Sequence, residues 1–306
     1  MERPRWNWSL LAPAHWPIWL GFGLLRLTAR LPYRLQLAMG ESLGGLLRRL
    51  MKSRVRVARR NLELCFPEMP EDQREDMIVR VFKSMGIMLM ETGIAWYGSP
   101  SRIRSLVTLK GFEQLDQAER EGHGVLLLAP HFTTLEICGH MLTLHPAMKK
   151  AGLYREHGNP ALEWLVRRGR LGYADAVYGR RETRAAIRHL RNGGLLWYAP
   201  DQDYERGDSV FVPFFGIQAS TTASPHQFAR LGKARVLVMR QRRLPDGAGY
   251  ELELVPWLDR IPSDDVEADC RLINETIEEA IRRCPEQYLW VHRRFKNRPP
   301  GEKSLY

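Results

Sequence analysis

The fold class is indicated most clearly by residues 124–129, Gly124-Val125-Leu126-Leu127-Leu128-Ala129, and by the residues that follow them, Pro130-His131-Phe132-Thr133-Thr134-Leu135-Glu136. The first six residues form an uninterrupted apolar run, which is typical of a strand buried on both faces of a parallel sheet. Pro130 ends this strand, and we expect a helix to begin after His131. Ligands bind beyond the carboxyl ends of such strands, so this polar loop is the first candidate site.

The same pattern recurs further along the chain. Four more short runs have the composition of strands, the last with one solvated face: residues 150–154, 195–199, 234–239 and 251–255. Helical stretches separate them, one opened by Pro160 and a long closing one over residues 264–283. This alternation predicts an α/β domain over residues 105–306, with a central mixed, partly parallel sheet flanked by helices.

A membrane anchor is predicted over residues 1–33. Residues 6–25 carry no formal charge and contain four tryptophans, the residue that favours the membrane–water interface: Trp6, Trp8, Trp16 and Trp19. No small-residue cleavage site follows, which argues against a removable signal. The segment can either span the membrane or lie in its plane, and a buried N-terminal helix is the alternative.

Residues 34–104 form a predicted helical, membrane-facing region. Over residues 43–58 leucines recur at helical spacing and are crowded by basic side chains, namely Arg48, Arg49, Lys52, Arg54 and Arg56. This pattern predicts a basic amphipathic helix at an anionic membrane surface, with a solvated helix face as the alternative. No nucleic-acid reading motif accompanies the charge, so we expect no nucleic-acid partner. A second helix is predicted over residues 71–97.

The composition excludes several classes of protein. Of the 306 residues, 44% are hydrophobic and 26% charged, which excludes a disordered chain, collagen and a coiled coil. The net charge is +11, with 38 Arg against 8 Lys, so we expect an anionic partner bound by forked arginine contacts. Four cysteines without a C-x-x-C pair indicate neither a zinc site nor a disulfide framework, and Cys270 and Cys284 are expected in the core.

Two loops carry the chemistry. Residues 129–136 and 199–204 each begin with Ala-Pro directly after an apolar run, which places His131, Glu136, Asp201 and Asp203 on one rim. Five residues on a continuous helix turn through about 140°, so His131 and Glu136 can meet only if His131 precedes the helix. A carboxylate behind an imidazole makes a general base, and without a protein nucleophile that base would activate a substrate hydroxyl.

Other interpretations of these residues stay open. His131 can be a hydrogen-bonded core histidine, and Cys138 is a rival nucleophile two turns away, although nothing in its surroundings marks it as activated. A metal site made from His131, Glu136 and His140 would have an incomplete set of ligands. We therefore expect neither a metal nor a cofactor.

The segment from Pro130 to Glu136 resembles the His-x4-acid motif of glycerolipid acyltransferases. Four further blocks resemble the late acyltransferases of lipid A biosynthesis: Arg60-Asn61-Leu62-Glu63-Leu64-Cys65-Phe66-Pro67-Glu68, Met90-Glu91-Thr92-Gly93-Ile94-Ala95-Trp96, Trp197-Tyr198-Ala199-Pro200-Asp201, and Pro285-Glu286-Gln287-Tyr288-Leu289-Trp290-Val291-His292-Arg293-Arg294-Phe295-Lys296. The Phe-Pro-Glu-Gly-Thr block of the phospholipid-making enzymes is absent, which argues against glycerol 3-phosphate as acceptor. The resemblance covers nearly the whole chain.

The resemblance implies transfer of a laurate-type acyl group from acyl carrier protein to a hydroxyl of an acyl chain on Kdo-lipid IVA, at the cytoplasmic face of the bacterial inner membrane. It implies that His131 is the base and Glu136 its partner. The candidate substrate-binding residues are Arg155, Arg170, Asp201, Asp203, Arg293 and Arg294. A structural role for Arg293 and Arg294 stays open, and the alternative function is a non-catalytic lipid-binding protein of the inner membrane surface.

Overall fold

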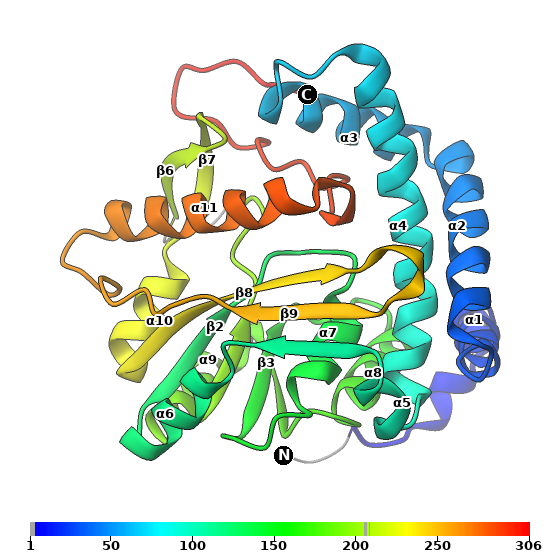
Figure 1. Cartoon of the computed structure of the whole chain (residues 1–306), viewed down its shortest axis with the longest axis horizontal. Coiled ribbons are helices and arrows are strands. Elements are labelled where there is room, and N and C mark those ends of the chain that lie inside the picture. Colours follow the sequence, from blue (N-terminus) through cyan, green and yellow to red (C-terminus); the bar gives the residue numbers. More distant parts are fainter. Residues whose placement is uncertain (1–3, 205–206, 208) are drawn as a thin grey trace.

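The computed structural model describes residues 4–204, 207 and 209–306. Its centre is a seven-stranded sheet in the order β1-β9-β8-β2-β5-β3-β4 (Figure 1). Neighbouring strands in this sheet run parallel except for the antiparallel pair β8 and β9. The strands are β1 Val107–Lys110, β2 Gly124–Leu128, β3 Lys150–Tyr154, β4 Ala176–Gly179, β5 Leu195–Tyr198, β8 Ala234–Arg243 and β9 Tyr250–Leu254. The expected mixed, partly parallel α/β sheet is confirmed.

The five predicted strands are all present, and four more were not predicted. Two of these, β1 and β4, are the short edge strands of the sheet, each too brief for its periodicity to stand out. The other two form a separate antiparallel hairpin, β6 Ser209–Phe214 with β7 Ile217–Thr222.

Helices cover both faces of the sheet. Leu126 and Leu127 of β2 are fully buried and belong to different hydrophobic clusters, because successive strand side chains point to opposite faces. The cluster around Leu127 includes α6 and α7, whereas that around Leu126 includes α9, α10 and α11. These helices are α6 Glu113–Glu121, α7 Leu135–Leu142, α9 Thr183–Arg191, α10 Ser224–Gly232 and α11 Val266–Arg283.

A long helix, α4 Glu71–Tyr97, carries the N-terminal helices α1 Trp16–Thr28 and α2 Tyr33–Leu50 along its outer side (Figure 1). Glycines make this close packing possible. A Cβ on Gly44 of α2 would lie 2.2 Å from the Phe82 carbonyl oxygen, and one on Gly86 of α4 would lie 2.1 Å from the Gly40 oxygen. The N-terminal helices are therefore packed directly onto the backbone of α4.

The predicted basic helix over residues 43–58 is wrong as one element. Its first part ends α2, and its second part lies in α3 Lys52–Cys65. Met51 separates the two with φ −95° and ψ 49°, which is outside the helical range. The basic residues of the pattern therefore surround a corner between two helices.

The structure agrees only in part with the membrane anchor predicted for the N-terminal segment. Among the described residues, no helix is long and apolar enough to cross a membrane, and α1 has 13 residues. Trp6 and Trp19 pack at ring distances of 5.2 and 5.7 Å on Trp164, which belongs to α8 Pro160–Arg170. Trp8 and Trp16 stay exposed. Two of the four tryptophans thus hold the segment to the body, while residues 1–3 of the predicted anchor lie outside the described part.

Candidate active site

The two candidate loops meet at one edge of the sheet. Strands β2 and β5 are parallel neighbours, so the segments after Leu128 and Tyr198 emerge side by side. Nδ1 of His131 lies 2.7 Å from Oδ1 of Asp201, and the backbone N–H of His131 donates to Oδ2 at 2.9 Å. Because Asp201 engages Nδ1, Nε2 is the ring nitrogen left for a substrate.

The carboxylate of Asp201 is completely buried. Burial by itself would raise its pKa, but the charge of His131 and the hydrogen bonds from His131 and Tyr288 outweigh it and lower the pKa below its usual value. Asp201 is therefore ionised at neutral pH, where it fixes the tautomer of His131 and stabilises the protonated ring.

The C-terminal tail holds this pair in place. The N–H of Leu289 donates to the His131 carbonyl at 3.0 Å, and Phe132 and Tyr288 form a β-bridge. His292 accepts a hydrogen bond from the Asp203 N–H at 3.0 Å, and burial lowers the pKa of His292 to about 4. A second, neutral imidazole thus lies close to His131.

The expected contact between His131 and Glu136 is wrong. A turn over residues 132–134 precedes α7, and Glu136 in the first helical turn faces α4 and α8 instead. Its carboxylate accepts hydrogen bonds from Trp96 Nε1 at 2.9 Å, Tyr173 Oη at 3.1 Å and Arg170 Nε at 2.9 Å. Burial opposes ionisation, but Arg170 and these hydrogen bonds lower the pKa of Glu136 overall.

Apart from Asp201, the predicted substrate-binding residues are of two kinds. Three are held by other parts of the protein, and two are exposed. Arg170 is held by Glu136, and Asp203 accepts from the backbone and side chain of Asn297 at 3.2 and 2.7 Å. Arg294 is buried and donates to the Ser220 carbonyl, which fits the structural role that the sequence left open for it. Two predicted residues remain exposed near the rim: Arg155 after β3, and Arg293, whose guanidinium lies 5.8 Å from the Tyr306 ring.

A buried network of hydrogen bonds also holds the His131 loop, through Thr133. Glu91 of α4 accepts from Arg243 Nε at 2.6 Å and Nη2 at 2.8 Å, and Arg243 also donates to the Ser84 hydroxyl at 3.1 Å. That hydroxyl lies 2.6 Å from Thr133 Oγ1, two residues after His131. The orientation of the His131 loop therefore depends on α4 and β8 as well as on the loop itself.

Cys138 is not placed as a nucleophile. Its side chain is fully buried in α7, and burial raises the pKa of the thiol far above its usual range. All four cysteines are buried and free, as expected for Cys270 and Cys284. His140 lies 2.7 Å from the Ala95 carbonyl, so it does not join His131, and the described residues contain no cluster suited to a metal.

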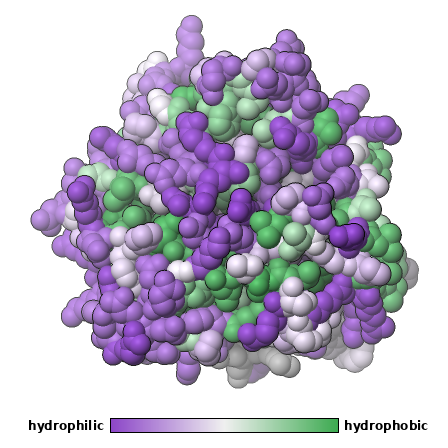
Figure 2. All heavy atoms as spheres, viewed as in Figure 1, coloured by the Kyte–Doolittle hydropathy of each residue, from purple (hydrophilic) through white to green (hydrophobic). Residues whose placement is uncertain are grey.

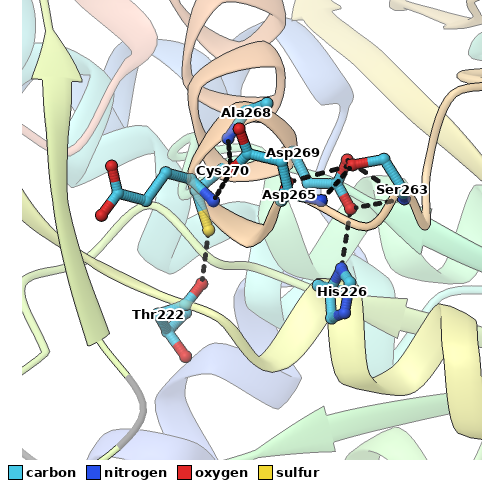
Figure 3. Close-up of polar contacts among 8 residues, drawn as sticks. Thr222, His226, Ser263, Asp265, Ala268, Asp269 and Cys270 are labelled. Atoms are coloured by element: carbon cyan, nitrogen blue, oxygen red, sulfur yellow. Dashed lines mark hydrogen bonds and ion pairs between the residues drawn. The ribbon is translucent and has the colours of Figure 1, made fainter.

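A second His–Asp pair shows which histidine can meet a substrate. His226 Nδ1 lies 2.7 Å from Asp269 Oδ2, the same distance as in the first pair, and Ser263 also donates to Asp269 (Figure 3). The His226 side chain is only 5% exposed, whereas that of His131 is 24% exposed. The second pair joins α10 to α11 inside the protein, and the first opens to the surface.

Four residues of the site were missed: Trp96, Tyr173, Tyr288 and His292. Each of them contacts a partner at least 37 residues away in the sequence, and motif spacing cannot identify contacts at that separation. Trp96, Tyr288 and His292 lie in blocks that carry the family resemblance, which is the signal that could have identified them.

A family model for bacterial lipid A biosynthesis acyltransferases matches residues 3–297. The chain is 41% identical over 305 residues to the lipid A biosynthesis lauroyltransferase of Escherichia coli, covering 99% of both chains. It is 40% identical to the palmitoleoyltransferase of the same organism over 97% of each, and 29% identical to its myristoyltransferase over 99% of this chain and 94% of the relative.

The chain therefore belongs to the family of bacterial lipid A biosynthesis acyltransferases. It is a transferase that acts in lipid A biosynthesis, and the non-catalytic lipid-binding alternative is set aside. His131 and Asp201 are the residues around which its chemistry is best sought.

Proposed function

We propose that the enzyme transfers a laurate-type acyl group from acyl carrier protein to a hydroxyl on an acyl chain of Kdo-lipid IVA. We further propose that His131 is the general base and that no acyl-enzyme forms. The observation that carries this mechanism is an accessible imidazole held by a buried aspartate at the carboxyl edge of the sheet. The buried Cys138 thiol supports a direct transfer.

In this mechanism the acceptor hydroxyl gives its proton to Nε2 of His131 while its oxygen attacks the thioester carbonyl carbon. The carbon–sulfur bond then breaks, and the departing thiolate takes the proton back from the imidazolium. Asp201 stabilises the imidazolium in between. A thioester is already activated, so a positioned base without a covalent intermediate is enough.

The charge of the protein suits both substrates. Kdo-lipid IVA carries phosphates and sugar carboxylates, and acyl carrier proteins are acidic. Arg155 and Arg293 are exposed near the rim, where forked guanidinium contacts can bind such anions. The net charge of the chain, +11, favours fast encounter with an acidic donor.

We also propose that α1 and α2 attach the enzyme to the membrane by lying in its plane. Each helix exposes large apolar side chains on one stripe, here called the apolar stripe: Trp16, Leu20, Leu24 and Leu27 on α1, and Leu35, Met39, Leu46 and Leu50 on α2. Leu20 and Leu50 are 73% and 70% exposed. Figure 2 shows hydrophobic surface at its right-hand edge, where Figure 1 places these helices. A surface hollow lies at the end of the stripe, and its basic lining suits anionic headgroups. The lining includes Arg48, Arg49, Lys52 and Arg56.

The test of the catalytic proposal compares the two histidines. Purified His131→Ala and His226→Gln are assayed with lauroyl acyl carrier protein and Kdo-lipid IVA in mixed micelles, with rates expressed per folded molecule. We expect His131→Ala to lose about a thousandfold or more in turnover, while His226→Gln loses stability and keeps its turnover. Substantial transfer by a folded His131→Ala enzyme would exclude His131 as the base.

A further inference from the structure

A narrow apolar cavity lies on the α7 side of the sheet, beside the His131 loop. Its volume is about 50 Å³ and it is partly open to solvent, so it has room only for a narrow apolar group. Helix α7 and strands β3, β4 and β5 supply most of its wall: Leu135, Gly139, Leu142, Gly152, Val177 and Trp197. None of these residues has a part in the proton transfer.

The cavity reaches the start of α7, the helix that follows the His131 loop. Leu135 lines it four residues after His131, and Arg170, which holds Glu136, lines it as well. From there it follows β3, whose residues from Leu153 back to Lys150 all contribute to the wall. Strands rise about 3.3 Å per residue, so this wall extends roughly 10 Å away from the carboxyl edge.

Lys150 stands at the inner end of this wall, on the first residue of β3. The residue is buried, and its ammonium group donates to the carbonyl oxygens of His145, Ala147 and Met148 at 2.8, 2.5 and 3.1 Å. The charge is thus directed into the turn before β3, which leaves the methylene stem on the cavity side. A hydrocarbon chain that reached further would have to displace these hydrogen bonds, which is costly in a buried place.

Gly152 leaves the middle of the cavity open. A Cβ built on this glycine meets no atom within 4 Å, although Gly152 pairs with Trp197 of β5 and Val177 of β4 on either side. A side chain at this position has open space for its Cβ and would extend into the cavity. Gly152 therefore sets the width of the cavity, and Lys150 closes its inner end.

We propose that this cavity holds the distal part of the transferred acyl chain, and that Lys150 and Gly152 set the length of chain the enzyme prefers. The inference rests on the proposed function, since it requires an acyl thioester whose carbonyl carbon lies at His131. Three relatives in Escherichia coli are named for different acyl groups, namely lauroyl, palmitoleoyl and myristoyl. A wall built from a few exchangeable side chains is a simple means of setting such a preference.

The test offers purified enzyme an equimolar mixture of decanoyl, lauroyl, myristoyl and palmitoyl acyl carrier protein, and measures the lipid products by mass spectrometry. Gly152→Val narrows the cavity and should shift the products toward shorter chains. One methylene in an apolar pocket is worth about tenfold or more in selectivity, so we expect the short-to-long product ratio to rise by at least that factor. Lys150→Ala removes the end wall and should shift the products toward longer chains.

Gly158→Val is the matched control, because Gly158 also has open space around its Cβ position but lies outside the cavity. Its products should match those of the wild type. Gly152→Val is the decisive variant, because it keeps the hydrogen bonds of the Lys150 ammonium group, which Lys150→Ala would remove. A folded Gly152→Val enzyme with the wild-type product distribution would overturn the proposal. Failure of the wild-type enzyme to transfer any of the four chains would instead contradict the proposed donor.

Discussion

At the scale of single residues, access to solvent separates two nearly identical pairs. His131–Asp201 and His226–Asp269 have the same nitrogen–oxygen distance, and both aspartates are buried. The pairs differ in whether the imidazole opens to the surface and in what surrounds the carboxylate. Asp201 is approached by Tyr288 and the backbone of the catalytic loop, whereas Asp269 also accepts from Ser263. The geometry of the pairs alone does not single out His131 as the candidate base.

Glu136 has a structural role that a pH series can measure. Its folded-state pKa is lowered, so it stabilises the fold above the ordinary value of 4.5 and loses this contribution as the pH falls through the folded-state value. Breaking a buried ion pair costs about 3 kcal/mol. We therefore expect Glu136→Gln to lower the free energy of unfolding by about that amount at neutral pH.

The same difference between wild type and Glu136→Gln should shrink as the pH falls below 4.5, because the wild-type carboxyl group then protonates. Urea unfolding of both proteins across an acid pH series measures it. A difference that stayed constant down to the lowest pH would show that ionisation of Glu136 does not stabilise the fold.

At the scale of elements, the packing of α2 on α4 depends on individual glycines. Gly44 has no room for a Cβ, while the next residue, Gly45, has nothing within 4 Å of that position. Gly44→Ala should therefore destabilise the protein by about 1–3 kcal/mol through overpacking. Gly45→Ala should be neutral or stabilise it by up to about 1 kcal/mol, because alanine favours the helix. Thermal unfolding of the two variants tests this, and equal effects would contradict the described packing.

Sequence patterns predicted a helix or strand correctly where a single run of residues determines it. The strand after Gly124, the helix over residues 71–97 and the helix opened by Pro160 are confirmed. The break at Met51 was missed because leucine spacing continues through it. The partner of His131 was predicted as Glu136, five residues away, and is Asp201, 70 residues away. Sequence spacing favours near neighbours, whereas parallel strands bring distant loops together.

At the scale of the whole molecule, the apolar stripe and the active site belong to different parts of the structure. Helices α1 and α2 lie outside α4, and α4 in turn supports the catalytic loop through Glu91, Arg243 and Ser84. Helix α4 thereby connects the proposed membrane surface to the site.

Membrane attachment can be tested without deleting the helices that pack on α4. Leu20 and Leu24 are exposed, so the double substitution Leu20→Glu with Leu24→Glu should leave the fold intact. Burying one leucine is worth about 1.5–3 kcal/mol, so vesicle binding at high salt should fall at least tenfold. The control is Leu231→Glu, an exposed leucine on α10 outside the stripe. Co-sedimentation with anionic vesicles measures it, and unchanged binding by the double variant would exclude the stripe.

The most direct test of the account compares Asp201→Asn with Glu136→Gln in single-turnover acyl transfer, using lauroyl acyl carrier protein and Kdo-lipid IVA. Because Asp201 engages Nδ1 of His131, its amide substitute should favour the wrong tautomer and slow the chemical step by about 10³–10⁴-fold. Glu136→Gln should lose stability but keep most of the rate per folded molecule. The reverse result, a fast Asp201→Asn enzyme and an inactive, folded Glu136→Gln enzyme, would contradict the assignment of Asp201 as the partner of the catalytic base.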